Sequence, residues 1–176
     1  GGHLGKMMPS DALTINPYLG EDACEPFIQI AKKEGAGLYV LVKTSNPGAE
    51  TFQNHGTPPL SDKIAEKVAE WGAQYMGTNG WSNIGAVIGA TRPQELKHFR
   101  KLMPQTPFLL PGFGFQGGTA GGLKSAFDKN KNGAIVNSSR GITLAHLRPE
   151  LKHLTTWEKQ TEGAIIEMKE QLETIF

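Results

Sequence analysis

The stretch FLLPGFGFQGG, residues 108–118, joins a short apolar run to a turn that contains one proline, four glycines and a single glutamine. A short apolar run that ends at proline or glycine is typical of a strand buried on both faces of a sheet. The same order, an apolar or β-branched run, then a polar or glycine-rich break, then a helical pattern, occurs five times along the chain. The five runs are 11–18, 37–44, 84–90, 108–113 and 134–138.

The segments between these runs carry helical patterns with recognisable starts. We expect Ser61 to cap one helix, and Thr91 with Gln94 to form a capping box at the start of the next. Apolar residues spaced three and four apart lie on one face of a helix, so each pattern predicts a face that packs on the sheet. The expected faces are Ile64, Val68, Trp71 and Tyr75, then Leu96, Phe99 and Met103, and last Ile165, Met168, Leu172 and Ile175.

Repeated strand-helix units predict an α/β fold with a parallel sheet and right-handed crossovers. Such a sheet is either an open doubly wound sheet or part of a (βα)8 TIM barrel, and a complete barrel has about 250 residues. The chain has 176 residues and about five βα units, so an incomplete barrel is expected. We expect residues 11–176 to be the C-terminal part of a single barrel domain, and residues 1–10, which do not begin with methionine, to be a tag scar or a truncated end.

The composition favours a small-molecule ligand. The net charge is +1, and Lys and Arg are scattered among Asp and Glu instead of forming a basic run. Nucleic acid and anionic membrane are therefore poor partners. A single cysteine, Cys24, excludes an internal disulfide. Because no signal-peptide pattern or long apolar stretch is present, we expect a cytoplasmic protein.

The last two breaks predict a phosphate site. Ligands of parallel α/β folds bind at the carboxyl ends of the strands, where these breaks lie. The four glycines of residues 111–118 leave backbone N–H groups open to an anion. Arg140, after the fifth run, adds a guanidinium that suits two oxygens at once. A glycine-rich tight turn with no ligand is the alternative for the loop alone.

Two further polar residues follow strands on the same side of the predicted sheet. Gln116 and Ser45 each offer a hydrogen-bond donor and an acceptor, which suits the edge of a pyrimidine or a sugar hydroxyl. An ordinary loop-capping hydrogen bond explains either residue alone equally well. Together with Arg140, they predict a site for a nucleotide monophosphate.

Four stretches of the sequence resemble one known family. They are DALTINPYLG (11–20), LVKTSNPGAETFQ (41–53), FLLPGFGFQGG (108–118) and AIVNSSRGIT (134–143). The last three are similar, in order and spacing, to orotidine 5'-phosphate decarboxylase. The first is similar to the bacterial type 2 branch of that family.

The resemblance implies a (βα)8 barrel that works as a homodimer. It also implies a carbon-carbon lyase that converts orotidine monophosphate to uridine monophosphate in pyrimidine biosynthesis, with no metal and no organic cofactor. The substrate-binding residues implied by position are Ser45, Pro111, Phe113, Gln116, Ser139 and Arg140.

The resemblance also implies a role for each of these residues. Ser45 corresponds to the residue that hydrogen-bonds the pyrimidine ring, and Gln116 to the glutamine that bridges phosphate and base when its loop closes. Arg140 corresponds to the phosphate-binding arginine, with the backbone amides of Ser139 and Arg140 beside the phosphate. The proline and the phenylalanine of the set correspond to positions that lie against the base.

One part of the family pattern is missing. The family's catalytic lysine lies in an Asp-x-Lys-x-x-Asp motif at the end of the third strand, and this sequence contains no such motif. Asp62-Lys63 and the stretch 128–131 have the wrong neighbours. We therefore expect no catalytic residue in this chain, and we expect the motif to lie upstream of Asp11. The chain would supply the pyrimidine- and phosphate-binding half of the enzyme.

Two other functions fit parts of the sequence. A related barrel that acts on sugar phosphates would use metal-binding carboxylates and would lack the pairing of Ser45 with Gln116. A short protein that binds nucleotides without catalysis, or that completes a partner chain as a half-barrel, would explain the missing lysine motif. The five histidines show no metal-ligand spacing.

Overall fold

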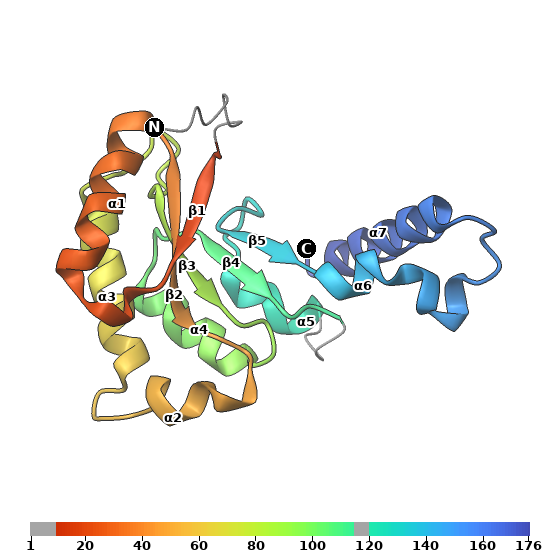
Figure 1. Cartoon of the computed structure of the whole chain (residues 1–176), viewed down its shortest axis with the longest axis horizontal. Coiled ribbons are helices and arrows are strands. Elements are labelled where there is room, and N and C mark those ends of the chain that lie inside the picture. Colours follow the sequence, from red (N-terminus) through yellow and green to blue (C-terminus); the bar gives the residue numbers. More distant parts are fainter. Residues whose placement is uncertain (1–9, 115–119) are drawn as a thin grey trace, which may run out of the picture.

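The computed structural model of the chain describes residues 10–114 and 120–176 (Figure 1). Five parallel strands form one sheet in the order β1-β2-β3-β4-β5. Each strand pairs with its neighbour in sequence, whereas a doubly wound sheet reverses its order at a switch point. The sheet is therefore a consecutive part of a barrel. The strands are β1 Ala12–Ile15, β2 Gly37–Lys43, β3 Ile84–Ile88, β4 Phe108–Pro111 and β5 Ala134–Asn137.

Helices connect the strands as predicted. The α-helices are α1 Glu21–Glu34, α2 Glu50–Gln53, α3 Leu60–Ala73, α4 Pro93–Leu102, α5 Ala120–Leu123, α6 Ser139–Thr143 and α7 Trp157–Glu173. Short 3-10 helices are η1 Pro17–Leu19, η2 Pro47–Ala49, η3 Lys124–Ala126, η4 Ala145–Leu147 and η5 Pro149–Leu151.

The main core lies between the sheet and the helices α1, α3 and α4. Figure 1 shows α1 and α3 on the same side of the sheet. Val68 of α3 and Phe99 of α4 are buried in the same cluster as Val40 and Ile88 of the central strands. The predicted faces of α3 and α4 pack on this core, which confirms the helical spacing read from the sequence. Burying these side chains contributes on the order of 1.5–3 kcal/mol each.

Burial on both faces was predicted for every strand, and it holds only in the middle of the sheet. All five residues of β3 are buried. By contrast, Leu13 of β1 is 49% exposed and Ile135 of β5 is 55% exposed. β1 and β5 are the outer strands of the described sheet, so each has a neighbour on one side only. The prediction is therefore wrong for these two strands.

Two predicted helix caps are wrong by a residue or two. α3 begins at Leu60 after Pro59, and Ser61 lies buried inside its first turn at 2% exposure. α4 begins at Pro93 with Arg92 as its N-cap and no side-chain cap bond, so Thr91 and Gln94 do not form a capping box. Proline is favoured at the first helical position, where its missing N–H has no partner to lose. That preference fixes the start of α4 after Thr91.

The last helix packs differently from the other long helices. α7 is capped by Thr156, whose hydroxyl accepts from the Lys159 amide at 3.4 Å, and it extends away from the sheet beyond β5 (Figure 1). Met168, Leu172 and the following Ile175 reach the main core as predicted, but Ile165 is 41% exposed. In the first half of α7 the buried residue is Ala164, which forms a second small core with Ala145 and Leu151.

Candidate functional site

The carboxyl ends of the strands form one rim, at the end of the sheet where α2 lies (Figure 1). Backbone hydrogen bonds continue past the strands. Gly89 N donates to Lys43 O at 2.8 Å, and Ala90 N donates to Pro111 O at 2.9 Å. Pro111 is in turn paired with Asn137 in the sheet. The loops after β2, β3, β4 and β5 are therefore held side by side.

A pocket of about 180 Å³ lies between the loops that follow β4 and β5. Its lining residues are Pro111, Gly112, Phe113, Asn137, Ser138, Ser139, Arg140 and Gly141. The structure thus brings together four of the six residues that the sequence predicted for the site. Arg140 is the only cation among the lining residues of this pocket.

Ser138 ties the two loops together, and sequence reasoning missed it as a site residue. Its hydroxyl donates to the backbone carbonyl of Phe113 at 3.1 Å. A Cβ at Gly141 would lie 2.5 Å from Ser138 Oγ, so a larger residue there would displace the Ser138 hydroxyl. Gly112 and Gly114 adopt positive φ angles of 94° and 71°, which fit glycine best. The sequence signal was available: a serine directly after the strand, next to the two residues that were named.

A second cavity of about 270 Å³ adjoins the first and shares Phe113, Ser138 and Gly141 with it. α7 closes its other side with Met168 and Glu167. Glu167 Oε2 accepts a hydrogen bond from Arg148 Nη2 at 2.6 Å. A larger hollow with a mostly apolar wall therefore lies beside the pocket at Arg140.

Ser45 lies on the same rim but outside these two cavities. It follows β2 and packs on Gly89, where a Cβ would lie 3.0 Å from both the Ser45 Cβ and the Ser45 amide. Neighbouring strands are about 4.8 Å apart, so β2 and β4 are separated by roughly 10 Å across β3. Gln116, the remaining predicted site residue, lies outside the described residues.

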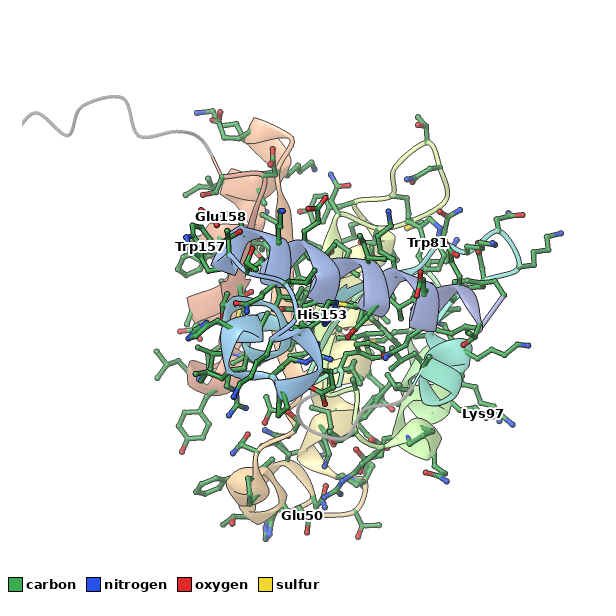
Figure 2. The ribbon with its side chains drawn as sticks, turned by 90° about the vertical axis from the view of Figure 1, so that its right-hand side faces the viewer. Glu50, Trp81, Lys97, His153, Trp157 and Glu158 are labelled. Carbon is green, nitrogen blue, oxygen red and sulfur yellow. The ribbon has the colours of Figure 1, made fainter. Side chains whose placement is uncertain are left out.

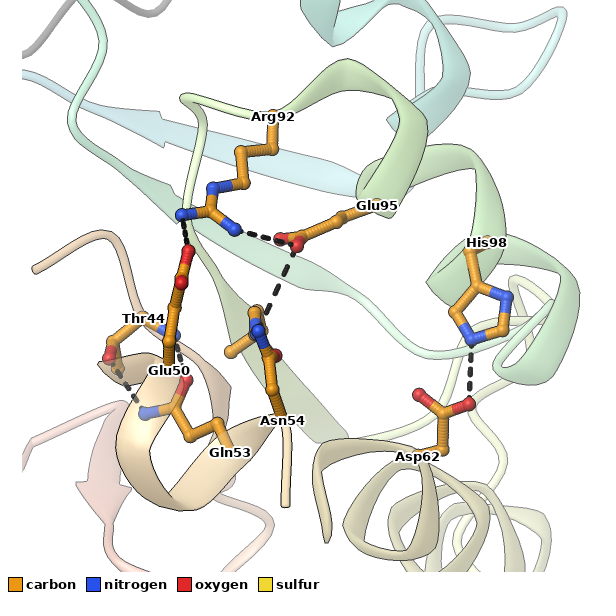
Figure 3. Close-up of polar contacts among 9 residues, drawn as sticks. Thr44, Glu50, Gln53, Asn54, Asp62, Arg92, Glu95 and His98 are labelled. Atoms are coloured by element: carbon orange, nitrogen blue, oxygen red, sulfur yellow. Dashed lines mark hydrogen bonds and ion pairs between the residues drawn. The ribbon is translucent and has the colours of Figure 1, made fainter. Parts of the chain in front are cut away.

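A polar cluster, called the Lys43 cluster below, supports the loop that carries Ser45. Its members are Lys43, Thr44, Glu50, Gln53, Asn54, Arg92 and Glu95. Figure 3 shows Arg92 between Glu50 and Glu95, and Thr44 paired with Gln53. The Arg92 guanidinium lowers the pKa of the Glu50 carboxyl, first through a hydrogen bond and then through its charge.

No metal site or membrane span is found in residues 10–114 and 120–176. No three His, Cys, Asp or Glu side chains in this part of the chain lie close enough together to hold a metal ion. His98 instead pairs with Asp62 at 2.9 Å on the surface, between α4 and α3 (Figure 3). None of the helices described is both long and apolar enough to cross a membrane.

Comparison with known proteins identifies the family. A model of the orotidine 5'-phosphate decarboxylase / HUMPS family matches residues 6–152. The chain belongs to this family. Family membership agrees with the pocket, because the matched region includes both of the loops that form it.

Individual decarboxylases of the family are similar over most of this chain. The orotidine 5'-phosphate decarboxylase of Rhodopirellula baltica is 44% identical over 168 residues, which are 93% of this chain and 56% of that protein. The structure of Leishmania donovani OMP decarboxylase matches with a TM-score of 0.69 at 28% identity, over 94% of this chain and 57% of that one.

A third likeness concerns the fold alone. The orotidine 5'-monophosphate decarboxylase of Methanocaldococcus jannaschii, solved in complex with the inhibitor BMP, matches with a TM-score of 0.64 at 22% identity, over 88% of this chain and 60% of that one. These decarboxylases are TIM barrels, which confirms the predicted fold class. The chain spans about half the length of the curated decarboxylases it matches.

Proposed function

We propose that the whole protein decarboxylates orotidine 5'-phosphate to uridine 5'-phosphate, and that this chain supplies the phosphate- and pyrimidine-binding part. The observation that carries the proposal is the pocket between the β4 and β5 loops. It gathers Pro111, Phe113, Ser139 and Arg140 in a chain whose relatives are named decarboxylases of this substrate.

Arg140 is the proposed phosphate ligand. A guanidinium offers a planar fork of donors that matches two phosphate oxygens, and it stays charged at any working pH. Arg140 lies on the exposed rim and lines the pocket together with Ser139. The positive φ of Gly112 and Gly114 lets the facing loop approach without a side chain in the way. An anion in this pocket would meet the Arg140 guanidinium on one side and the loop of Pro111, Gly112 and Phe113 on the other.

Ser45 is the proposed contact for the pyrimidine edge. It lies on the same rim as the pocket and is separated from it by the end of β3. A ligand that reaches both Arg140 and Ser45 must therefore extend along the rim, as a nucleotide monophosphate does. Gln116, in the glycine-rich stretch 111–118, is proposed to bridge phosphate and base.

Chemistry at the base needs an acid that this sequence does not contain. The Asp-x-Lys-x-x-Asp motif is absent from the 176 residues, so the proton donor is assigned to another part of the whole protein. The residues of this chain contribute binding energy at a group that does not react. Such remote binding can hold a closed, water-excluding site in which charge interactions are stronger. We further propose that the whole protein acts in the cytoplasm as a homodimer, without metal or organic cofactor.

The test compares ligands that share a phosphate. Calorimetry on the whole protein should show that uridine monophosphate binds more tightly than ribose 5-phosphate, because only the nucleotide reaches both ends of the rim. The whole protein should release carbon dioxide from orotidine monophosphate. Equal affinity for the two phosphates would favour a sugar-phosphate enzyme. Nucleotide binding without carbon dioxide release would favour a non-catalytic nucleotide-binding protein.

A further inference from the structure

The end of β2 carries a buried lysine that the proposed site does not use. Lys43 is 3% exposed, although lysine is almost never buried unless it is paired. The register between β2 and β3 shifts between Leu41 and Lys43, the mark of a β-bulge. A bulge can re-aim the side chain that follows it. Here the Lys43 side chain reaches the end of α2 and the first turn of α4, where it meets Asn54 and Glu95.

The contacts of Lys43 tie three elements together. Its Nζ donates to Asn54 Oδ1, directly after α2, and lies 3.9 Å from Glu95 Oε1 of α4. Desolvating an ammonium costs several kcal/mol, and an apolar side chain of similar length would avoid that cost. Stability alone therefore does not explain a lysine at this position. The elements that it holds in place give a better explanation.

A second set of hydrogen bonds holds the two residues next to Ser45 in the sequence. The Thr44 amide donates to Gln53 Oε1 at 2.9 Å, and Gln53 Nε2 donates to Thr44 Oγ1 at 2.8 Å (Figure 3). Thr44 Oγ1 donates in turn to Asn46 Oδ1 at 2.6 Å. Thr44 and Asn46, the residues on either side of Ser45, are thus both held by side-chain hydrogen bonds. Gln53 holds Thr44 through both its amide and its hydroxyl.

The outer part of the cluster anchors this loop to the next strand-helix unit. Arg92 donates to Glu50 of α2 and, at 3.2 Å, to Glu95 of α4. Glu95 is therefore shared by Arg92 and Lys43. Beneath the loop, Ser45 packs closely over Gly89, where an added Cβ would lie 3.0 Å from both the Ser45 Cβ and the Ser45 amide.

We propose that Gln53 and Lys43 are positioning residues. They hold the Ser45 hydroxyl at the point on the rim where it meets the pyrimidine edge. They act through the backbone of residues 44–46 and do not touch the ligand themselves. The inference rests on the proposed function, because it takes Ser45 as a contact of the base. The inference adds to the proposed site two residues, Lys43 and Gln53, that sequence reasoning did not identify.

The test uses Gln53→Ala in the whole protein, with affinities for uridine monophosphate and ribose 5-phosphate measured by calorimetry. Loss of the two hydrogen bonds between Gln53 and Thr44 should weaken uridine monophosphate binding roughly three- to tenfold, the equivalent of one hydrogen bond. Ribose 5-phosphate binding should be unchanged. Gln160→Ala is the matched control. It removes a glutamine whose Nε2 donates to the Leu154 carbonyl at 2.9 Å in the distant α7 region. The control should not alter the ratio of the two affinities.

Two further variants keep the test decisive if Gln53→Ala folds poorly. Thr44→Val keeps the shape of the side chain and removes the hydroxyl that Gln53 binds. Lys43→Met keeps the length and removes the charge. Both should lower the affinity ratio in the same direction, and neither should weaken ribose 5-phosphate binding.

A double substitution separates this inference from the function on which it rests. If Gln53 acts through Ser45, Gln53→Ala should have no further effect on uridine monophosphate binding in a Ser45→Ala background. If Ser45→Ala lowers the ratio but Gln53→Ala and Thr44→Val do not, the positioning role is wrong and the proposed site stands. If Ser45→Ala itself changes nothing, the assignment of the base contact is wrong, and the positioning role is overturned with it.

Discussion

Two arginines at opposite ends of the same pair of strands have opposite environments. Arg100 lies at the amino ends of β4 and β5, where its Nη1 donates to the carbonyls of Met103 and Thr106 at 2.9 and 2.8 Å. Its Nη2 donates to the carbonyls of Ala126 and Gly133 at 2.8 and 2.9 Å. Arg140 follows β5 at the carboxyl end, where it is exposed and lines a pocket.

The two ends of the sheet can be seen in Figure 2, where Trp81 and Glu50 lie far apart at opposite ends. The Arg100 guanidinium is stacked 3.7 Å from the centre of the Phe108 ring and 5.2 Å from that of Trp81. Burial lowers its pKa to about 10. The arginine at the amino end thus bonds to four backbone carbonyls of the fold, while the arginine at the carboxyl end lines the pocket that we propose for the ligand. The same division between a stabilising face and a functional face is general in TIM barrels.

The largest expected effect comes from removing the Arg100 contacts at the amino ends of β4 and β5. Arg100→Met should lower the free energy of unfolding by roughly 3–5 kcal/mol, because several buried carbonyls lose their donor at once. Urea denaturation measures the change. Arg100→Lys should recover only part of the loss, since an ammonium cannot reproduce the planar fork that serves four carbonyls. A loss below about 1 kcal/mol for Arg100→Met would contradict the structural role.

The matching change at the carboxyl end should affect mainly ligand binding. Arg140→Ala in the whole protein should weaken uridine monophosphate binding by about 1.5–3 kcal/mol, the range for a hydrogen bond to a charged group. Its free energy of unfolding should change by less than that of Arg100→Met. Lys152→Ala, which removes an exposed cation outside the pocket, is the control for net charge. Unchanged affinity by calorimetry would remove Arg140 from the site.

A smaller effect is expected where the two loops of the carboxyl end meet. Ser138→Ala removes the hydrogen bond to the Phe113 carbonyl and should lower the free energy of unfolding by about 1 kcal/mol. Because that bond holds one wall of the pocket against the other, phosphate affinity should fall as well. Thr143→Val provides the contrast, since the Thr143 hydroxyl lies outside the pocket and, among the contacts described, donates only locally to the Ser139 carbonyl at 2.9 Å. Equal effects of the two substitutions would show that the link between the loops is unimportant.

The smallest effect concerns pH. Because Arg92 lowers the pKa of Glu50, this carboxylate stabilises the folded state above its ordinary pKa, and the contribution is lost as pH falls through the lowered value. Glu50→Gln should therefore flatten the acid side of the stability curve. In this variant Glu21 should still contribute to the pH dependence of stability, because hydrogen bonds from Trp71 and then Lys67 lower its pKa. Thermal melts between about pH 3 and 6 measure the difference, and a curve identical to that of the parent would contradict it.

The strand ends and the pocket-forming loops at the carboxyl end of the sheet could be predicted from the sequence, and the contacts at the amino end could not. Glycine, proline and arginine directly after apolar runs indicate where the strands end and which loops meet there. Arg100 carries no such local signal. It lies in a helix rich in charged residues, where a solvated side chain is the normal expectation. Its burial depends on carbonyls of residues up to 33 positions away in sequence, so only the three-dimensional arrangement reveals it.

Other differences have equally local causes. Ser61 and Thr91 were expected as caps because their side chains suit that role, but the prolines at 59 and 93 fix where the helices begin. Strand periodicity could not show that β1 and β5 are exposed, since burial at the outer strands depends on what lies beside them. The Lys43 cluster was missed because its partners come from three separate elements.

The bulge in β2 has a consequence for how this sequence can change in length. Side chains along a strand alternate between its two faces, and one extra residue reverses the alternation for everything that follows. Removing a single residue near Val42 would restore regular pairing with β3, yet it would turn the loop behind it toward the opposite layer. Among natural variants, single-residue deletions should therefore be rarer at this point than substitutions of the same residues.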